Sequence, residues 1–281
     1  MKILVTGANG QLGTAFKNVI HDAIFFGREL DITSYNTLDN YLSSVKIDLI
    51  INCAAYTKVD KAEDEKEEAL KVNTSSIENL VKLQEKYNFS IIHFSTDYVF
   101  DGKSSRPYRE TDQTCPINYY GQTKLASEDI LIKNSNNYLI FRISWLYYRF
   151  GYNFVKTMLN IMGNGKDLNI VSDQIGSPTN AFDLADVINK IINNCGYNFT
   201  DFKGIYNFSN EGVASWYDFA KAISRIKNYN NEIKPILTKD YPTAAKRPSL
   251  SVLDKSKVKS ELNVNTIHWY DSLERELKEF L

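Results

Sequence analysis

Tyr120 and Lys124 are the residues of this sequence best placed to do chemistry. They are four positions apart, in Tyr-Gly-Gln-Thr-Lys, so on a helix both side chains project from one face. A free phenol titrates at about pH 10, and a neighbouring ammonium stabilises the phenolate and lowers that pKa. The pair is therefore suited to give a proton to the alkoxide that forms when a carbonyl group is reduced.

A hydroxyl group that could assist this pair lies earlier in the chain. Thr96 ends an apolar run, stands 24 positions before Tyr120 and is followed by Asp97. The Thr96 hydroxyl can hydrogen-bond a substrate carbonyl oxygen, and Asp97 can accept hydrogen bonds from ligand hydroxyls or serve only as a turn residue. We therefore predict that Thr96, Tyr120 and Lys124 are catalytic, with Thr96 and Asp97 also binding substrate.

A glycine-rich turn near the N-terminus predicts a dinucleotide site. The segment 6–13 reads Thr-Gly-Ala-Asn-Gly-Gln-Leu-Gly and joins an apolar run to a helical pattern. Glycines at such a turn allow a sharp bend and a close approach of the backbone to a pyrophosphate, and the helix N-terminus offers N–H groups to the anion. The cofactor contacts predicted here are Gly7, Gly10, Gln11, Leu12 and Gly13. Tyr120 and Lys124 are also predicted to contact the cofactor, with Lys124 holding the nicotinamide ribose.

The residue after the second apolar run bears on the choice of cofactor. NAD-specific proteins often place an acid there, whereas this chain has Arg28 followed by Glu29. A guanidinium at this position can pair with a 2′-phosphate, although an arginine just beyond a strand is often simply exposed. We expect NADPH as the cofactor, with NADH possible.

The elements that must position these residues alternate along the first half of the chain. Short, continuously apolar runs predict strands covered on both faces, and the amphipathic segments between them predict the covering helices. The expected fold is a doubly wound, Rossmann-like α/β parallel sheet. The expected strands are Ile3–Thr6, Ala23–Gly27, Leu49–Ala54, Ser90–Ser95 and Tyr138–Ser144. The expected helices are Gln11–Ile20, Ser34–Val45, Glu63–Tyr87 and Asn118–Lys133.

The regular alternation weakens after about residue 150. We predict a dinucleotide-binding domain at 1–150 and a smaller, mainly substrate-binding lobe at 151–281. Helical patterns occur there at 153–162, 181–194 and 215–226, and strand-like runs at 168–172 and 205–209. Segments around 165–195 and 203–209 are expected to return to the main sheet, so the two lobes should interleave.

Composition excludes several classes of function. The 33 basic and 34 acidic residues nearly cancel, so no overall field attracts nucleic acid or an anionic membrane. Cys53, Cys115 and Cys195 lack the short paired spacings of a zinc or disulfide framework, which favours the reducing cytoplasm. No apolar run approaches the ~18 residues of a spanning helix. We expect a cytoplasmic protein that binds a small molecule, without nucleic acid or membrane partners.

Longer segments resemble the dTDP-4-dehydrorhamnose reductases, a family of extended short-chain dehydrogenases/reductases. The similar segments are 6–13, 52–63, 94–102, 120–128, 141–147, 173–179 and 247–253. The resemblance implies reduction of the C4 keto group of dTDP-4-dehydro-6-deoxy-L-mannose to dTDP-L-rhamnose, for cell-surface polysaccharide. The partner it implies is a nucleotide-diphosphate sugar.

The same resemblance suggests further contacts. It places Asp31 and Ile32 beside adenine, and Ala54, Ala55 and Tyr56 against the cofactor. Trp145, just after the fifth strand, can hold substrate or pack in the core. Arg247 can present its fork to the diphosphate or lie on the surface. Trp145 and Arg247 join Thr96 and Asp97 as the predicted substrate-binding residues.

Two departures from the family pattern affect these expectations. Some relatives form a dimer around a magnesium ion held by glutamates, one of them early in the first helix, but Ala15 and its neighbours offer no acid. We therefore expect no obligatory metal, and either a monomer or a homodimer. The segment 147–151, Tyr-Tyr-Arg-Phe-Gly, is bulkier than the expected turn, which bears on the shape of the sugar site.

Two other functions share these motifs. A nucleotide-sugar epimerase or dehydratase of the same superfamily uses the same turn and Tyr/Lys pair but retains and recycles NAD. A non-catalytic nucleotide-binding regulatory subunit would bind an enzyme partner without turnover. The intact set of Thr96, Tyr120 and Lys124 favours a reductase over the regulatory subunit.

Overall fold

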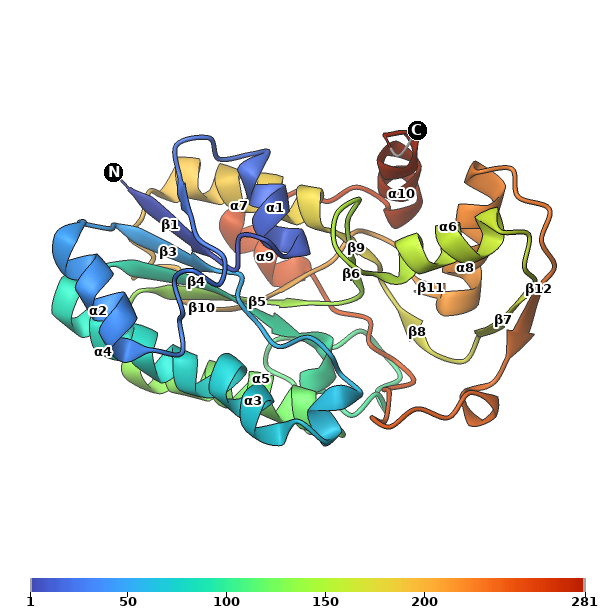
Figure 1. Cartoon of the computed structure of the whole chain (residues 1–281), viewed down its shortest axis with the longest axis horizontal. Coiled ribbons are helices and arrows are strands. Elements are labelled where there is room, and N and C mark those ends of the chain that lie inside the picture. Colours follow the sequence, from blue (N-terminus) through green and yellow to red (C-terminus); the bar gives the residue numbers. More distant parts are fainter. Residues whose placement is uncertain (1, 280–281) are drawn as a thin grey trace.

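The computed structural model describes residues 2–279, and a parallel six-stranded sheet lies at its centre (Figure 1). The strand order is β10-β5-β4-β3-β1-β2, with every neighbouring pair parallel. The order reverses between β1 and β3, as in doubly wound sheets. The strands are β1 (Ile3–Thr6), β2 (Ile24–Phe25), β3 (Leu49–Asn52), β4 (Ser90–Thr96), β5 (Tyr138–Ile143) and β10 (Gly204–Phe208).

Helices cover both faces of this sheet, which explains the continuously apolar strands. On one face, Val5 and Ile51 pack with α1 (Gln11–Lys17), α7 (Ala181–Cys195) and α9 (Ser256–Leu262). On the other face, Leu4 and Ile50 pack with α2 (Tyr35–Ser44), α4 (Ser76–Tyr87) and α5 (Tyr119–Asn134). Figure 1 shows the two helical layers on either side of the sheet.

Polar side chains fix where several of these helices begin. Asn118 accepts a hydrogen bond from the Gly121 N–H at 2.8 Å and starts α5. Ser34 starts α2 in the same way, through the Thr37 N–H. Such caps satisfy backbone donors that have no partner inside the helix.

The predicted helix at 63–87 is interrupted. A 3-10 turn η1 (Lys61–Glu63) is followed by α3 (Lys66–Leu70), a π-helical turn η2 (Lys71–Ser75) and then α4. Asn73 within η2 is buried and bonds both the N–H and the C=O of Tyr56. The π turn therefore serves a polar contact with another segment, which helical periodicity alone does not reveal.

A second, smaller lobe forms beside the carboxyl ends of the main strands (Figure 1). Its core joins α6 (Phe154–Gly163), α8 (Trp216–Ile226) and α10 (Trp269–Lys278). The strand β7 (Leu168–Val171) pairs with β12 (Ile233–Ile236) in a separate two-stranded sheet. The expectation that 168–172 returns to the main sheet is therefore wrong, because its pairing partner is a strand of its own lobe.

Short elements connect the two lobes. Two small ladders pair β6 (Leu146–Tyr147) with β9 (Thr179–Asn180), and β8 (Ile175–Gly176) with β11 (Ala214–Ser215). The remaining turns are η3 (Asp97–Val99) and η4 (Thr238–Asp240). Although both follow residue 150, β10 is a strand of the main sheet and α7 packs on one face of it, so the chain passes repeatedly between lobes.

Candidate active site

A pocket of about 940 Å³ lies where the carboxyl ends of β1, β3, β4 and β5 face the smaller lobe. Most of the predicted functional side chains meet there. The wall includes Gly10, Gln11, Leu12, Ala54, Ala55, Thr96, Asp97, Tyr120, Lys124, Trp145 and Arg247. Side chains from α6 and α8 close the opposite wall, namely Phe154, Trp216 and Phe219.

Tyr120 begins α5 beside the end of β4. Its ring makes an edge contact with Tyr98, with centroids 6.0 Å apart. Burial raises the pKa of the Tyr120 phenol, the Asp97 charge raises it further, and hydrogen bonding to Thr96 opposes them. The phenol is therefore protonated at neutral pH in this state, as a proton donor must be.

Lys124 lies one helical turn beyond Tyr120 and is fully enclosed, with 2% exposure. Burial lowers the pKa of its amine to about 8, and the Glu128 charge opposes that effect. Its Nζ lies 3.2 Å from Nε2 of His93 on β4. The amine therefore titrates close to neutrality, unlike an exposed lysine.

Thr96, the last residue of β4, and Asp97, which follows it, both line the pocket. The Thr96 hydroxyl donates to Asp97 Oδ1 at 2.9 Å and accepts the Tyr98 N–H at 3.2 Å. Within residues 2–279, Asp97 Oδ2 is buried without a hydrogen-bond partner. Burial raises the pKa of Asp97 to about 7, although the Thr96 hydroxyl lowers it. A buried oxygen of this kind is suited to accept a ligand hydroxyl.

The glycine turn has the shape that a pyrophosphate cradle needs. Gly7 has φ +64°, and a side chain there would begin 2.4 Å from the Ala54 N. A side chain at Gly13 would begin 2.4 Å from the Gly7 carbonyl oxygen. No side chain caps the N-terminus of α1, and its first turn holds no acidic residue. The turn therefore leaves backbone N–H groups for an anionic ligand.

Three predicted cofactor contacts, Arg28, Asp31 and Ile32, lie outside the pocket wall. Arg28 is exposed, and Ile32 is buried in the core between β1 and α2. The Asp31 carboxylate accepts the Thr33 N–H and hydroxyl at 2.9 and 2.7 Å. None of the three is in the pocket wall formed by the described residues.

Tyr56, also predicted as a cofactor contact, is held by protein groups, and its contact with the cofactor stays a prediction. Its hydroxyl donates to Glu65 at 2.5 Å, and its backbone N–H and C=O are both held by Asn73. Of the small segment 54–56, only Ala54 and Ala55 face the pocket in the part of the chain that the structure describes. The polar groups of Tyr56 are satisfied by the helical layer.

Trp145 and Arg247, the other two predicted substrate-binding residues, both contact protein side chains. Trp145 stacks on Trp216, with ring centroids 3.6 Å apart and an interplanar angle of 8°. Arg247 donates to both carboxylate oxygens of Asp60, at 3.0 and 2.6 Å. Arg247 is thus neither a free fork nor an exposed surface residue, since its side chain is only 17% exposed.

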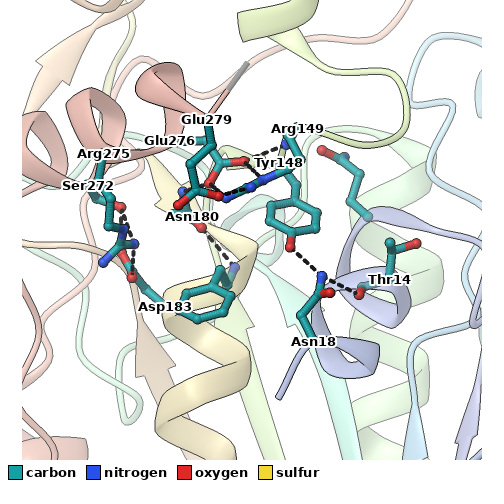
Figure 2. A network of polar contacts seen from close by, with 12 residues as sticks. Thr14, Asn18, Tyr148, Arg149, Asn180, Asp183, Ser272, Arg275, Glu276 and Glu279 are labelled. Carbon is teal, nitrogen blue, oxygen red and sulfur yellow. Dashed lines mark hydrogen bonds and ion pairs between the residues drawn. The ribbon is translucent and has the colours of Figure 1, made fainter. Parts of the chain in front are cut away.

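The bulky segment 147–151 packs over the cofactor turn. A Cβ at Gly151 (φ +79°) would lie 2.8 Å from Gln11 Cγ, and Asn153 donates to Gln11 Oε1 at 2.8 Å. Asn18, the C-cap of α1, donates to the Tyr148 hydroxyl at 2.8 Å (Figure 2). The loop therefore contacts both ends of α1.

The C-terminal helix holds the same loop from the other side. Figure 2 shows Arg149 reaching Glu276 and Glu279 of α10. Glu276 is buried, and its Oε1 accepts the Arg149 N–H at 2.7 Å while its Oε2 accepts from Asn180. These contacts connect α10, the loop and the start of α7 in one network.

Some residues of the site carried no recognisable signal in the sequence. His93, Asn52, Asp60 and Trp216 belong to the pocket wall or to its immediate support. Both His93 and Asn52 lie in strands that the apolar pattern identified, and a polar residue inside such a run is the only available clue. Their contacts cross three strands, which sequence spacing does not show.

Residues 2–279 contain neither a metal-binding cluster nor a membrane-spanning helix. There is no group of three or more His, Cys, Asp or Glu side chains arranged to hold a metal ion. No helix in that range is long and apolar enough to cross a bilayer. The expectation of no obligatory metal stays a prediction.

The fold and the site together define a class. A doubly wound parallel sheet, a glycine turn after β1, a hydroxyl at the end of β4 and Tyr-x-x-x-Lys on the next helix are the features of extended short-chain dehydrogenases/reductases. The comparisons with known proteins narrow this class.

All 281 residues match the model of the family described as RmlD substrate binding domain. A dTDP-4-dehydrorhamnose reductase of Aggregatibacter actinomycetemcomitans is 39% identical over 97% of each chain. That of Sinorhizobium fredii is 36% identical over 98% of this chain and 96% of its own. A crystal structure of the Bacillus anthracis reductase, in complex with NADP, has a TM-score of 0.92 at 36% identity and 99% coverage of both chains. This chain belongs to the dTDP-4-dehydrorhamnose reductase family.

Proposed function

We propose that this protein uses NADPH to reduce the C4 keto group of dTDP-4-dehydro-6-deoxy-L-mannose, giving dTDP-L-rhamnose. The observation that carries the proposal is the meeting of Thr96, Asp97, Tyr120 and Lys124 in one pocket with the glycine turn. The similarity to named dTDP-4-dehydrorhamnose reductases over nearly the full length supports the substrate. The NADP complex of the Bacillus anthracis relative supports the cofactor.

The chemistry assigned to the chain is proton transfer and orientation. When bound, NADPH supplies the hydride that reduces the carbonyl carbon. The Thr96 hydroxyl hydrogen-bonds the carbonyl oxygen, and the Tyr120 hydroxyl donates the proton that completes the alcohol. Lys124, in its charged form, stabilises the phenolate left on Tyr120 and orients the ribose of the cofactor.

Substrate recognition divides between polar and apolar groups. Asp97 Oδ2 accepts a sugar hydroxyl, and the stacked Trp145 and Trp216 offer a flat apolar wall. Arg247 binds the diphosphate and gives up part of its ion pair with Asp60 when it does so. The fork geometry of the guanidinium suits both partners.

The cofactor site is assigned to the turn 7–13 and to Ala54 and Ala55, with Asp31 and Ile32 at the adenine side. Arg28 is exposed beyond β2 and is assigned to the 2′-phosphate. Arg28→Ala should then weaken NADPH binding about tenfold and leave NADH binding nearly unchanged, because only NADPH carries that phosphate. Fluorescence titration of both cofactors measures this, and equal weakening of both would reject the assignment.

The activity itself is tested with purified protein and dTDP-4-dehydro-6-deoxy-L-mannose. We expect one NADPH oxidised per molecule of dTDP-L-rhamnose formed. Purification with bound NAD, and sugar conversion without net cofactor oxidation, would instead indicate an epimerase or dehydratase. Stoichiometric recovery of a partner enzyme without any turnover would indicate a regulatory subunit.

We also propose a cytoplasmic location and a monomeric or homodimeric state. The location rests on three cysteines that are all free thiols, as expected in a reducing compartment. Light scattering of the purified protein, with and without a chelator, measures the oligomeric state and its dependence on metal. A higher oligomer, or a dimer lost on chelation, would contradict the expectation.

A further inference from the structure

A row of buried polar side chains begins beside Lys124 and runs across the sheet. Thr6, Asn52 and His93 come from the neighbouring strands β1, β3 and β4, and Ser127 comes from α5. All four are at most 1% exposed. Buried polar groups cost stability unless they form hydrogen bonds with one another, so a row of this kind calls for a structural or functional explanation.

The hydrogen bonds in this row have a defined direction. Asn52 Oδ1 accepts from the Thr6 hydroxyl at 2.6 Å and from the Ala54 N–H at 3.3 Å. Its Nδ2 therefore faces His93 Nδ1, at 3.2 Å, and donates to it. A neutral imidazole that accepts at Nδ1 carries its proton on Nε2.

The other side of His93 meets both Ser127 and Lys124. The Ser127 hydroxyl donates to the Lys124 carbonyl at 2.6 Å, so it can accept the His93 Nε2–H at 3.0 Å. The Lys124 Nζ lies 3.2 Å from the same Nε2. Within residues 2–279, His93 is the one hydrogen-bond partner of that Nζ.

An imidazole suits this position because it can match either charge state of the amine. With its proton on Nε2 it can donate to a neutral amine. With its proton on Nδ1 it accepts from an ammonium. Rotation of the Asn52 amide then turns Oδ1 toward Nδ1 and Nδ2 toward the Thr6 hydroxyl, which can accept, while the Ala54 N–H gives up its 3.3 Å bond. Burial, followed by the Lys124 charge, lowers the pKa of His93 well below its usual value, so the ring stays neutral throughout.

We propose that His93, supported by Asn52, is a positioning residue for Lys124 that keeps the Nζ hydrogen-bonded both as an ammonium and as an amine. This inference rests on the proposed reductase function, in which the charged form of Lys124 stabilises the phenolate of Tyr120. It assigns to His93 no contact with substrate or cofactor.

The other charged groups around Lys124 are balanced or distant. On α5, Glu128 is paired with Arg142 of β5 at 2.7 Å. Tyr120 on α5 and Asp97 after β4 share the pocket wall, and so does Cys53 after β3, whose thiol pKa is raised by burial. The π turn η2, packed on α5, contributes the uncharged Asn73 and Thr74, while its Lys71 is exposed.

His93→Leu keeps the bulk of the side chain and removes the hydrogen-bond partner. An unpaired buried ammonium is destabilised more than an unpaired buried amine, so Lys124 should lose its proton at lower pH. We expect the alkaline limit of kcat to fall by about one pH unit in this variant. In His93→Gln the amide can offer its oxygen or its N–H to Nζ, so the limit should stay near that of the wild type.

A second measurement does not depend on activity. In the unliganded protein, the free energy of unfolding of the wild type minus that of Lys124→Met should rise with pH from about 8, because only the unfolded chain then holds the Lys124 proton. The same difference, between His93→Leu and His93→Leu/Lys124→Met, should begin to rise about one pH unit lower.

The outcomes separate the two proposals. If the rise begins at the same pH with and without His93, or if Leu and Gln give the same alkaline limit, His93 only fills space and the inference is wrong. If wild-type protein fails to reduce the keto-sugar, the proposed function fails, while the unfolding comparison still decides the role of His93. Should His93→Leu not fold, the same unfolding comparison is made with His93→Gln and Asn52→Leu, and unchanged onsets in both would overturn the inference.

Discussion

At the scale of single residues, burial brings two ionisable groups of the pocket toward neutrality from opposite directions. The pKa of Asp97 rises to about 7 and that of Lys124 falls to about 8, in both cases mainly through burial. An acid and a base that exchange protons close to neutral pH are common in sites that move protons. Tyr120 stands between them in the pocket wall and keeps its proton.

Tyr120→Phe tests the proton donor with the smallest change in shape. We expect kcat to fall by at least about 100-fold, because the variant lacks only the hydroxyl that protonates the alkoxide. NADPH affinity, measured by fluorescence titration, should stay within about twofold, since the ring still packs on Tyr98. Tyr119→Phe is the matched control and should keep its turnover; near-normal turnover in Tyr120→Phe would reject the assignment.

Asp97→Asn tests the buried carboxyl through stability. The folded-state pKa of Asp97, about 7, lies above the usual value of 3.8. The folded protein therefore holds a proton that the unfolded chain releases between these pH values, so this group's contribution to stability is full below about pH 4 and is lost as pH rises through 7. Urea unfolding at pH 5 and pH 8 should show a smaller loss of stability in Asp97→Asn than in the wild type. An identical loss in both proteins would contradict this.

Sequence reasoning identified the residues that short spacings relate, and missed those that only the sheet brings together. Tyr120 and Lys124 share one helix, and Gly7 to Gly13 form one turn, so their geometry is local. The Arg247 pairing with Asp60 joins segments 187 positions apart. No local pattern encodes that contact, nor the bonds by which Asn73 and Glu65 hold Tyr56.

At the scale of elements, the position of Tyr120 depends on how closely α5 approaches η3. A Cβ at Gly121 would lie 2.2 Å from the Tyr98 carbonyl oxygen. Gly121→Ala must therefore push the start of α5 away from the end of β4, and Tyr120 moves with it. We expect a loss of about 1–3 kcal/mol in stability and a fall in kcat larger than the change in KM.

Gly163→Ala is the control for this prediction. A Cβ at Gly163, at the end of α6, has only an ordinary contact of 3.5 Å with the Tyr229 hydroxyl. Its stability and turnover should be close to wild type. Equal behaviour of the two variants in urea unfolding and steady-state kinetics would show that the tight approach of α5 does not position Tyr120.

The parallel strands and most helices of the sheet layer were predictable because burial on both faces leaves a continuous apolar signal. The second lobe was less predictable from the sequence. Its strand β7 resembles a main-sheet strand in composition, and its partner β12 contains Pro235 and exposed Lys234, which hide the strand pattern. The helix α10 was not anticipated, although it contributes to the core of that lobe.

At the scale of the whole molecule, the C-terminal helix supports the cofactor site at long range. The loop 148–153 contacts α1 through Asn18 and Gln11, and α10 holds that loop through Arg149 (Figure 2). These contacts form because the chain passes between the two lobes more than once, which brings α10 against the loop that follows β6. Substitutions in α10 should therefore change the affinity of the glycine turn for the cofactor.

Glu276→Gln tests this long-range support. Glu276 is buried and accepts from the Arg149 backbone and guanidinium and from Asn180. Removing its charge weakens the pairing of the partly buried Arg149, which keeps Glu279 as its other carboxylate partner. The change should cost about 1–3 kcal/mol of stability and weaken NADPH binding as the loop over Gln11 loosens. Glu274→Gln is the control on the same helix, since Glu274 has only an exposed pair with Lys278 and such pairs contribute little. Urea unfolding and NADPH titration of both variants decide the matter, because equal NADPH affinities would show that α10 stabilises its own lobe without acting on the cofactor turn.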